Sequence, residues 1–573
     1  MNLNRPLKPP KALSIFLLIG ILFLGLLIRI DHFTARWSDY LVPNWWSHLG
    51  WSGALYSIIG RNYLRYGFAT YLGPVVSTGL LPSDRLVFYG NHPPLLGWLI
   101  AMSFAVFGEH EWATRLVPLL FSLGGLVVMY ALVTQHFDRG VGLLATLLMA
   151  VVPMAAYYLG SFPDVQGPHV LFFMLLSLFF YFRWIESGKR GHYVGLALAV
   201  LCGILSDWPG LYTPLIIVAY HGFTQRRDTL PPLAILSAAS VVLVLALIWY
   251  LSWLVHDPWI FLKAFVSWSI AGKSELPNTS GLLSAILDWI TTVLGKHVLY
   301  LYTPVVLSLA VSYLIVRWFR MGRRRSPDRF HLVWLLLTFG SLHIVLGLRG
   351  ATTHDYWSMY LTPGLVLAAA LWLNDLSDPQ AGRSPGVRVV SLFVSCTVGL
   401  LGLYQVAERL DWRGSTGYLL AILLLGLAPF IPERPVWRRW DTAGMTIALG
   451  LVCFVLAAYG QTRMIWQRDN EGGLGAYHAA EVLRERTSPV EEILAGPSIA
   501  WWGHNPSFAY YADRRLIQID SIETLAARQT ERRFRYLILS KKAIDKDIAA
   551  HVTPRFYAEA VDGYLLVNLG RPP

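Results

Sequence analysis

Residues 89–98 read Tyr89-Gly90-Asn91-His92-Pro93-Pro94-Leu95-Leu96-Gly97-Trp98, a polar turn that runs directly into an apolar segment. This stretch lies near the end of residues 30–112, a long polar and aromatic-rich interruption of an otherwise apolar N-terminal half. Loops longer than about 15 residues are usually functional or disordered, and this one holds too many Trp and Tyr residues for disorder. We predict a folded first external loop (31–112) that carries part of an active site.

The composition indicates a polytopic α-helical membrane protein. The chain has 573 residues, 55% of them hydrophobic and 14% charged, and a mean hydropathy of +0.47, whereas soluble domains average about 25% charged residues. Apolar runs of about 20 residues, long enough to cross a hydrocarbon core of roughly 30 Å, recur before residue 465. Beyond it the chain is more charged. We therefore predict a transmembrane domain over 1–464 and an external α/β domain over 465–573.

The formal charge of +12 is explained better by membrane topology than by nucleic-acid binding. Most Lys and Arg clusters lie in short loops between apolar runs, as the positive-inside rule predicts for cytoplasmic loops. Basic residues precede the first apolar run, and further basic loops lie at 186–190, 225–228, 317–325 and 434–439. We predict a multi-pass protein of the cytoplasmic (inner) membrane with a cytoplasmic N-terminus and an external C-terminal domain.

About thirteen apolar runs are predicted to be transmembrane helices. They lie at 11–30, 113–135, 141–158, 168–184, 192–208, 210–223, 232–255, 298–317, 330–348, 357–374, 388–408, 416–431 and 442–460. By this count the apolar segment 94–107 has both ends on the external side, and its short length suits a re-entrant or interfacial helix. The three cysteines all fall inside apolar runs, so they offer neither a disulfide framework nor a zinc spacing.

The tail after residue 465 alternates helix and strand patterns, which predicts a small α/β unit. A helical pattern covers Ala476 to Arg486. Strand-like runs follow at 492–495, 516–519, 536–539 and 564–567.

His92-Pro93-Pro94 opens the predicted re-entrant helix. Prolines suit the first helical turn, because the N–H groups there lack intrahelical partners, and such an N-terminus attracts an anion. The external arginines Arg61, Arg65 and Arg85 are candidates to meet phosphate oxygens. In the alternative interpretation, the prolines only turn the chain and His92 caps the helix.

Asp164 lies in the external loop 161–169, between two apolar runs. A carboxylate at the membrane boundary is costly unless it is paired or used, and Gln166 and His169 in the same loop favour a functional site. The alternative is a cap for the following helix, a frequent role of aspartate.

His354-Asp355-Tyr356-Trp357 precedes another apolar run on the external side. A His-Asp pair suits a sugar hydroxyl or a phosphate, and the aromatic rings offer stacking surfaces. Tyr and Trp are also ordinary interfacial anchors, and both interpretations stay open. Asp207, at another external helix end, is interpreted as a helix cap.

Three separated motifs resemble those of polyprenyl-phosphate-sugar glycosyltransferases of the GT-C fold, in particular the superfamily of dolichyl-phosphate-mannose protein mannosyltransferases and lipid A aminoarabinose transferases. The motifs are residues 58–68, His92 to Leu95 and residues 107–116, which occur in the family's order. Residues 354–363 look like a later external motif of that family. Over roughly residues 11–375 the resemblance implies an inverting transfer of a sugar from a lipid phosphate to an acceptor on the outer side of the membrane.

In such families a carboxylate of the first external loop acts as the base on the acceptor, and a second external carboxylate corresponds to Asp164. Here Ser52-Gly53 stands where the resemblance implies an Asp-Glu pair, and Asn91 stands where an acidic residue often precedes the prolines. The base is left open among Asp39, His48 and Asp84, because a base needs reach and a suitable pKa.

These observations define a candidate site. The catalytic candidates are Asp164, His48, Asp39 and His92. The substrate-binding candidates are Arg61, Arg65, Asp84, Arg85, Asn91, His354, Asp355 and Tyr356. No metal ligands and no firm cofactor are predicted. Whether the reaction requires a divalent cation is left open. The expected partners are a polyprenyl-phosphate-linked sugar, a lipid, glycan or protein acceptor and membrane lipids, without nucleic acid. The rival interpretations are a transporter or flippase of a lipid-linked saccharide and a catalytically inactive scaffold.

Overall fold

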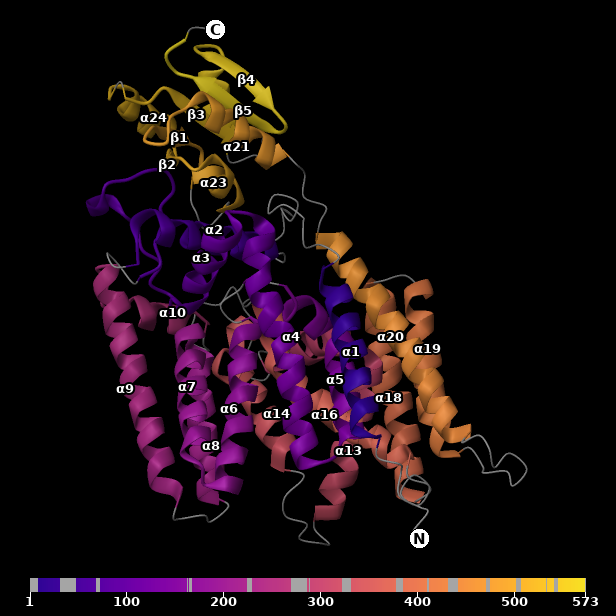
Figure 1. Ribbon diagram of the computed structural model, residues 1–573. Helices are drawn as coiled ribbons and strands as arrows, with labels where there is room; N and C mark the ends of the chain where they lie inside the picture. The colour runs from indigo at the N-terminus through magenta and orange to yellow at the C-terminus, as the bar shows by residue number, and fades with distance from the viewer. Residues whose placement is uncertain are drawn as a thin grey trace.

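The computed structural model describes residues 9–30, 48–68, 73–161, 163, 167–223, 229–268, 286–287, 289–321, 331–377, 385–409, 412–430, 442–469, 475–500, 506–531, 533–540 and 545–571. Asp39 and Asp164 lie outside these described residues, as does the side chain of His48, so their predicted roles stay predictions. A layer of long helices forms most of the molecule, and a small sheet domain caps one end of it (Figure 1).

Helices occupy the positions of the predicted spans. They are α1 (Lys11–Ile30), α4 (Glu111–His136), α5 (Arg139–Val151), α6 (Pro168–Ser187), α7 (Arg190–Ser206), α8 (Tyr212–Phe223), α9 (Leu230–Leu254), α13 (Thr303–Met321), α14 (His331–Leu346), α16 (Thr362–Ser377), α18 (Pro385–Arg409), α19 (Trp412–Leu427) and α20 (Thr442–Asp469). Among the described residues, seven helices are long and apolar enough to cross a membrane. The number is eight if two consecutive helices that meet at a bend of 108° form one span. The polytopic class is confirmed, whereas the count of thirteen stays a prediction.

Proline residues shorten two of the predicted spans. α5 ends at Val151, because Pro153 lacks an N–H and restricts the residue before it, and a π-helical turn, η3 (Met154–Tyr158), follows. Pro209 lies between α7 and α8, in the short turn η4 (Trp208–Leu211). A broken helix leaves carbonyl groups that side chains from elsewhere have to satisfy.

The first external loop folds around two helices, α2 (His48–Tyr66) and α3 (Leu95–Phe107), which lie next to the C-terminal domain (Figure 1). The two helices approach closely at small residues. A methyl group on Gly97 would come within 2.6 Å of the Ile59 side chain, so no larger residue fits there without a shift. Their shared core is apolar and separate from the main core of the helix layer.

Both ends of α3 contact the same end of the helix layer. At its start, the indole N–H of Trp208, after α7, donates to the Asn91 carbonyl over 2.7 Å. Near its end, the Ser103 hydroxyl donates to the carbonyl of Ala113, in the first turn of α4. This arrangement agrees with the prediction that the segment does not cross the membrane.

The C-terminal domain holds a five-stranded sheet in the order β2-β1-β3-β5-β4. The strands are β1 (Glu492–Ala495), β2 (Arg515–Gln518), β3 (Tyr536–Ser540), β4 (Tyr557–Val561) and β5 (Tyr564–Asn568). β1 pairs in parallel with β2 and β3, whereas β5 pairs antiparallel with β3 and β4. The helices are α21 (Gly475–Arg486), α22 (Pro497–Ala500), α23 (Pro506–Ala512), α24 (Ile522–Gln529) and α25 (Lys546–Val552). The four predicted strands are present, and β4 is an additional, partly exposed edge strand.

Contacts between turns show which helix ends lie together. Gln135, at the end of α4, donates to Glu186, at the end of α6, over 3.0 Å. Arg139, at the start of α5, donates to the carbonyl of Pro9, just before α1. These basic turns therefore share one end of the helix layer, while the C-terminal domain caps the other (Figure 1). By the positive-inside rule the first end is cytoplasmic, which stays a prediction.

Single-cysteine variants test this orientation. We expect an impermeant thiol reagent added outside the cell to label Asp84→Cys, in the exposed turn η2 (Ser83–Arg85), but not Lys189→Cys, between α6 and α7. The three natural cysteines are first replaced by alanine, so that the introduced thiol is the one that reacts. Labelling of position 189 without position 84 would reverse the predicted orientation.

Candidate functional site

His92 and Asp207 form a hydrogen-bonded pair between the first external loop and the end of α7. His92 Nδ1–H donates to Asp207 Oδ1 over 2.7 Å, and Nδ1 carries the proton because a carboxylate only accepts. The Asp207 side chain is fully buried, whereas 23% of the His92 side chain is exposed. Asp207 makes no capping hydrogen bond with its side chain, so its interpretation as a helix cap is wrong.

A second polar cluster joins the turn after α5 to the segment before α16. Tyr158 of η3 donates its hydroxyl to Asp355 Oδ1 over 2.6 Å, at the start of the turn η7 (Asp355–Leu361). The rings of His354 and Tyr356 stack with centroids 5.2 Å apart, and the Tyr356 ring lies 5.6 Å from that of Tyr158. The three predicted residues 354–356 therefore lie together, beside the tyrosine that precedes the loop of Asp164.

Aromatic residues connect these two clusters, because Tyr212 and His343 both interact electrostatically with Asp207 of the first cluster. Tyr212, at the start of α8, lies 6.1 Å from His343 of α14, and His343 stacks on Trp357 at 4.7 Å. Trp357 in turn stacks on His354 with centroids 6.4 Å apart. The Trp357 ring needs the glycines beneath it, because a methyl group on Gly350 would come within 2.3 Å of the ring. The two clusters thus belong to one packed region at the end of the helix layer.

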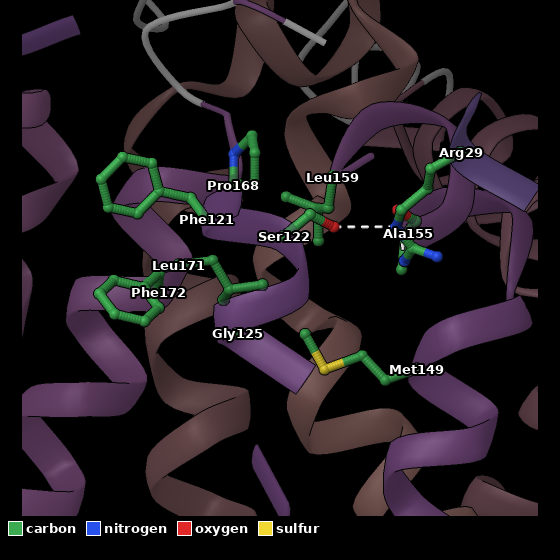
Figure 2. Close-up of a pocket in the computed structure, with 10 residues that line it drawn as sticks. All are labelled: Arg29, Phe121, Ser122, Gly125, Met149, Ala155, Leu159, Pro168, Leu171 and Phe172. Carbon is green, nitrogen blue, oxygen red and sulfur yellow. Dashed lines mark hydrogen bonds between the residues drawn. The ribbon is translucent and has the colours of Figure 1, made fainter. Parts of the chain in front are cut away.

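Arg29, buried at the end of α1, holds the break after α5 (Figure 2). Its guanidinium donates to the Ser122 hydroxyl over 2.9 Å and to the carbonyls of Gly25, Ala150 and Ala155. The last two carbonyls flank the break, where the helix cannot satisfy them. The small cavity beside Arg29 is lined mostly by apolar side chains of α4, α5 and α6. Because the guanidinium already makes four hydrogen bonds, we assign it a structural role.

Arg29→Met is expected to lower the thermal stability of the helix layer. The carbonyls of Ala150 and Ala155 lose their donor, and each buried polar group left without a partner costs about 1–3 kcal/mol. Thermal unfolding in detergent measures the effect, with Arg183→Met, an exposed arginine of α6, as the matched control. Equal melting temperatures for the two variants would contradict the structural role.

Two of the predicted phosphate-binding arginines contact the C-terminal domain. Arg65 Nη2 lies 2.6 Å from Asp513 Oδ2, and Arg61 Nη1 lies 3.1 Å from Asp513 Oδ1. Arg61 also pairs with Glu109, just before α4, and its guanidinium lies 4.4 Å from the centre of the Tyr510 ring. In the described structure these arginines thus link α2 to the segment from α23 to β2. Their predicted contact with a donor phosphate stays a prediction.

The backbone of the first external loop extends this interface. The Gly79 N–H donates to Asp513 Oδ1, and the Thr78 hydroxyl donates to the Arg514 carbonyl over 2.7 Å. Gly79 has a φ of 78°, and a methyl group there would come within 2.9 Å of the Arg515 nitrogen. Position 79 therefore requires glycine, for both its conformation and its space.

The remaining predicted residues lie around this interface. Arg85 Nη1 lies 3.8 Å from Glu492 Oε1, and 52% of the Arg85 side chain is exposed. Asp84 is exposed beside it, and Asn91 contributes its carbonyl to the contact with Trp208. The part of the chain that the structure describes contains no group of three His, Cys, Asp or Glu side chains that suits a metal ion.

Comparison with known proteins places part of the sequence in a known context. Residues 91–253 match the family described as dolichyl-phosphate-mannose-protein mannosyltransferase. Two proteins of Bacillus subtilis (strain 168), "Putative mannosyltransferase YkcB" and "Putative mannosyltransferase YycA", are 27% and 26% identical to this chain over 99 residues. Each match covers 17% of this chain and 14% of the relative, so these relatives are far longer than the matched part.

Solved structures resemble the whole chain. The structure of ArnT from Cupriavidus metallidurans bound to undecaprenyl phosphate matches with a TM-score of 0.60 and 16% identity, over 97% of both chains. The oligosaccharyltransferase AglB from Archaeoglobus fulgidus, in complex with an inhibitory peptide and a dolichol-phosphate, matches with a TM-score of 0.52 and 13% identity. That match covers 97% of this chain and 74% of the AglB chain. The predicted fold class is confirmed, and the chain is a polytopic membrane protein with the GT-C fold and a C-terminal sheet domain.

Proposed function

We propose that the protein is an inverting glycosyltransferase that moves a sugar from a polyprenyl phosphate to an acceptor on the outer side of the cytoplasmic membrane. The observation that carries the proposal is the full-length likeness to ArnT bound to undecaprenyl phosphate, which covers 97% of both chains. The AglB structure contains a dolichol-phosphate, another isoprenoid phosphate. The family that residues 91–253 match is named for a donor of the same class.

The packed region around the two polar clusters suits this chemistry. Carboxylates accept hydrogen bonds from sugar hydroxyls, and aromatic rings offer apolar faces on which a sugar ring can stack. Residues 354–356 supply both kinds of group. A departing lipid phosphate is stabilised by cations placed where its charge develops. Of the three predicted arginines, Arg85 is the most exposed and has the longest ion-pair distance. In this proposal it is the first candidate to meet the phosphate.

The proposed reaction is a single displacement. The acceptor oxygen forms a bond to the anomeric carbon while the bond from that carbon to the phosphate oxygen breaks, and the electron pair leaves with the lipid phosphate. A base removes the acceptor proton. One displacement inverts the anomeric configuration. Asp164, His48, Asp39 and His92 are the candidates for the base and for the carboxylate that supports the transition state.

An assay with defined donors tests the proposal. Purified protein is incubated with a panel of radiolabelled polyprenyl-phosphate sugars, and we expect release of free lipid phosphate from at least one of them, with heat-denatured protein as the control. Movement of a labelled lipid across the bilayer of a reconstituted vesicle, without phosphate release, would instead support a transporter or flippase. Neither release nor movement with any donor would support an inactive scaffold.

A further inference from the structure

The buried carboxylate of Asp207 lies in a place that disfavours its charge. Its side chain has no exposed surface, at the junction where α7 ends and the short turn η4 begins. A buried charge is strongly destabilising unless a partner compensates it. Hydrogen-bonding to His92 Nδ1–H, over 2.7 Å, supplies that partner. The pair therefore explains why the fold tolerates an aspartate here.

The ring of His92 is held in one orientation from several sides. Asp207 fixes its Nδ1, the Tyr89 ring packs against it with centroids 5.8 Å apart, and Pro93 and Pro94 restrict the backbone that follows. The neighbouring Asn91 carbonyl is bonded to Trp208. Such support places a reactive side chain within the small tolerance that catalysis requires. The His92 side chain is 23% exposed, so part of it reaches the surface of the described structure.

We propose that His92 is the base that takes the proton of the acceptor hydroxyl, and that Asp207 is a positioning residue that acts through it. This inference rests on the proposed function. It also accounts for a departure in the sequence, since Ser52-Gly53 stands where the resemblance implies the carboxylate base. With Nδ1–H bonded to Asp207, the lone pair of Nε2 is the one that accepts a proton.

The step balances in atoms and charge. The acceptor oxygen bonds to the anomeric carbon, its proton moves to His92 Nε2, and the lipid phosphate leaves with the electron pair of the broken bond. The imidazolium that forms is stabilised by the Asp207 carboxylate, as in other His–Asp pairs. The proton then leaves His92 to water or to the phosphate. Tyr212 of α8 and His343 of α14 also face the Asp207 carboxylate and interact with it electrostatically.

Three variants distinguish a base from a structural or phosphate-binding histidine. His92→Gln keeps a hydrogen-bond donor but takes up no proton, and His92→Lys keeps a positive charge but is already protonated at neutral pH. We expect both to lower kcat by roughly 100-fold or more, the usual effect of losing a general base. Asp207→Asn should lower kcat as well, because the amide favours the wrong tautomer. His110→Gln, an exposed histidine just before α4, is the control with unchanged kcat.

The pH profile supplies a readout that a purely structural role would not move. In the wild type we expect kcat/KM to rise with pH along an acid limb, because a base acts only when it is unprotonated, and this limb should vanish in His92→Gln and shift in Asp207→Asn. Retained kcat in His92→Lys would overturn the proposal in favour of a phosphate contact. Near-normal kcat in a folded His92→Gln, with an active wild type, would overturn it while leaving the proposed function intact. A wild type without transfer would overturn both.

Discussion

Replacing Asp513 with alanine is expected to loosen the C-terminal domain from the first external loop and to lower the free energy of unfolding by roughly 3–5 kcal/mol, the usual cost of removing one partner from a buried ion pair. The carboxylate contacts Arg61, Arg65 and the Gly79 N–H. Without it, two arginine side chains that are 9% and 19% exposed keep their charge beside each other. Glu109 compensates Arg61 only in part.

Thermal unfolding and limited proteolysis of the tail measure this effect. Asp562→Ala is the matched control, because Asp562 belongs to the same domain, pairs with His478 and is 57% exposed. Exposed pairs contribute about 0–1 kcal/mol, so the control should unfold and be cleaved like the wild type. Equal behaviour of Asp513→Ala and Asp562→Ala would show that the interface does not depend on this carboxylate.

The same carboxylate predicts a pH dependence. Burial raises the pKa of Asp513, but the hydrogen bond from Arg65 and the charges of Arg61 and Arg65 outweigh it, so the pKa lies below its usual range. A carboxyl whose pKa is lower in the folded state stabilises the fold above its unfolded pKa, about 3.9, and this contribution is lost as the pH falls toward the folded value. The stability gap between wild type and Asp513→Ala should therefore be full at neutral pH and shrink in acid.

Asp164→Asn is expected to lower sugar transfer at least roughly 100-fold, the effect typical of losing one positioned acid–base or electrostatic group. The variant keeps the size of the side chain and removes its charge, so insertion and folding should survive. The expectation depends on the sequence, which places a carboxylate at an external helix boundary, and on the neighbourhood of the loop. Tyr158, which precedes the loop, is bonded to Asp355 in the second polar cluster.

The control for this variant is Asp257→Asn. Asp257 lies after α9, where it pairs with the exposed Lys263, and it should tolerate the change with little effect on turnover. Turnover is measured with the donor identified in the assay above, after size-exclusion chromatography has shown that each variant is intact. Near-normal transfer by Asp164→Asn would reduce Asp164 to a helix cap. The supporting carboxylate would then have to be sought at Asp39, Asp84 or Asp355.

The sequence by itself determined the helices of the membrane domain and most strands of the tail. A helix in lipid satisfies its own backbone hydrogen bonds, so an apolar run is a sufficient local signal. The strands β1 and β3 are equally clear, because each contains a run of consecutive buried apolar side chains, 493–495 and 536–539. The edge strand β4 is not clear from the sequence, because its side chains include Glu559 and are partly exposed. Pro153 interrupts the predicted span 141–158, and the local sequence does not show that Arg29 satisfies the freed carbonyls.

Only the tertiary structure decided which polar side chains meet. His92 and Asp207 are 115 residues apart, and Arg65 and Asp513 are 448 residues apart. From its local sequence Asp207 resembles a helix cap, and Arg65 resembles a free cation for a phosphate. Their partners come from elements that the packing of the helix layer and the docking of the C-terminal domain bring alongside. A local pattern encodes the backbone of one segment, whereas a buried charge is compensated by whatever the complete fold places within hydrogen-bonding distance.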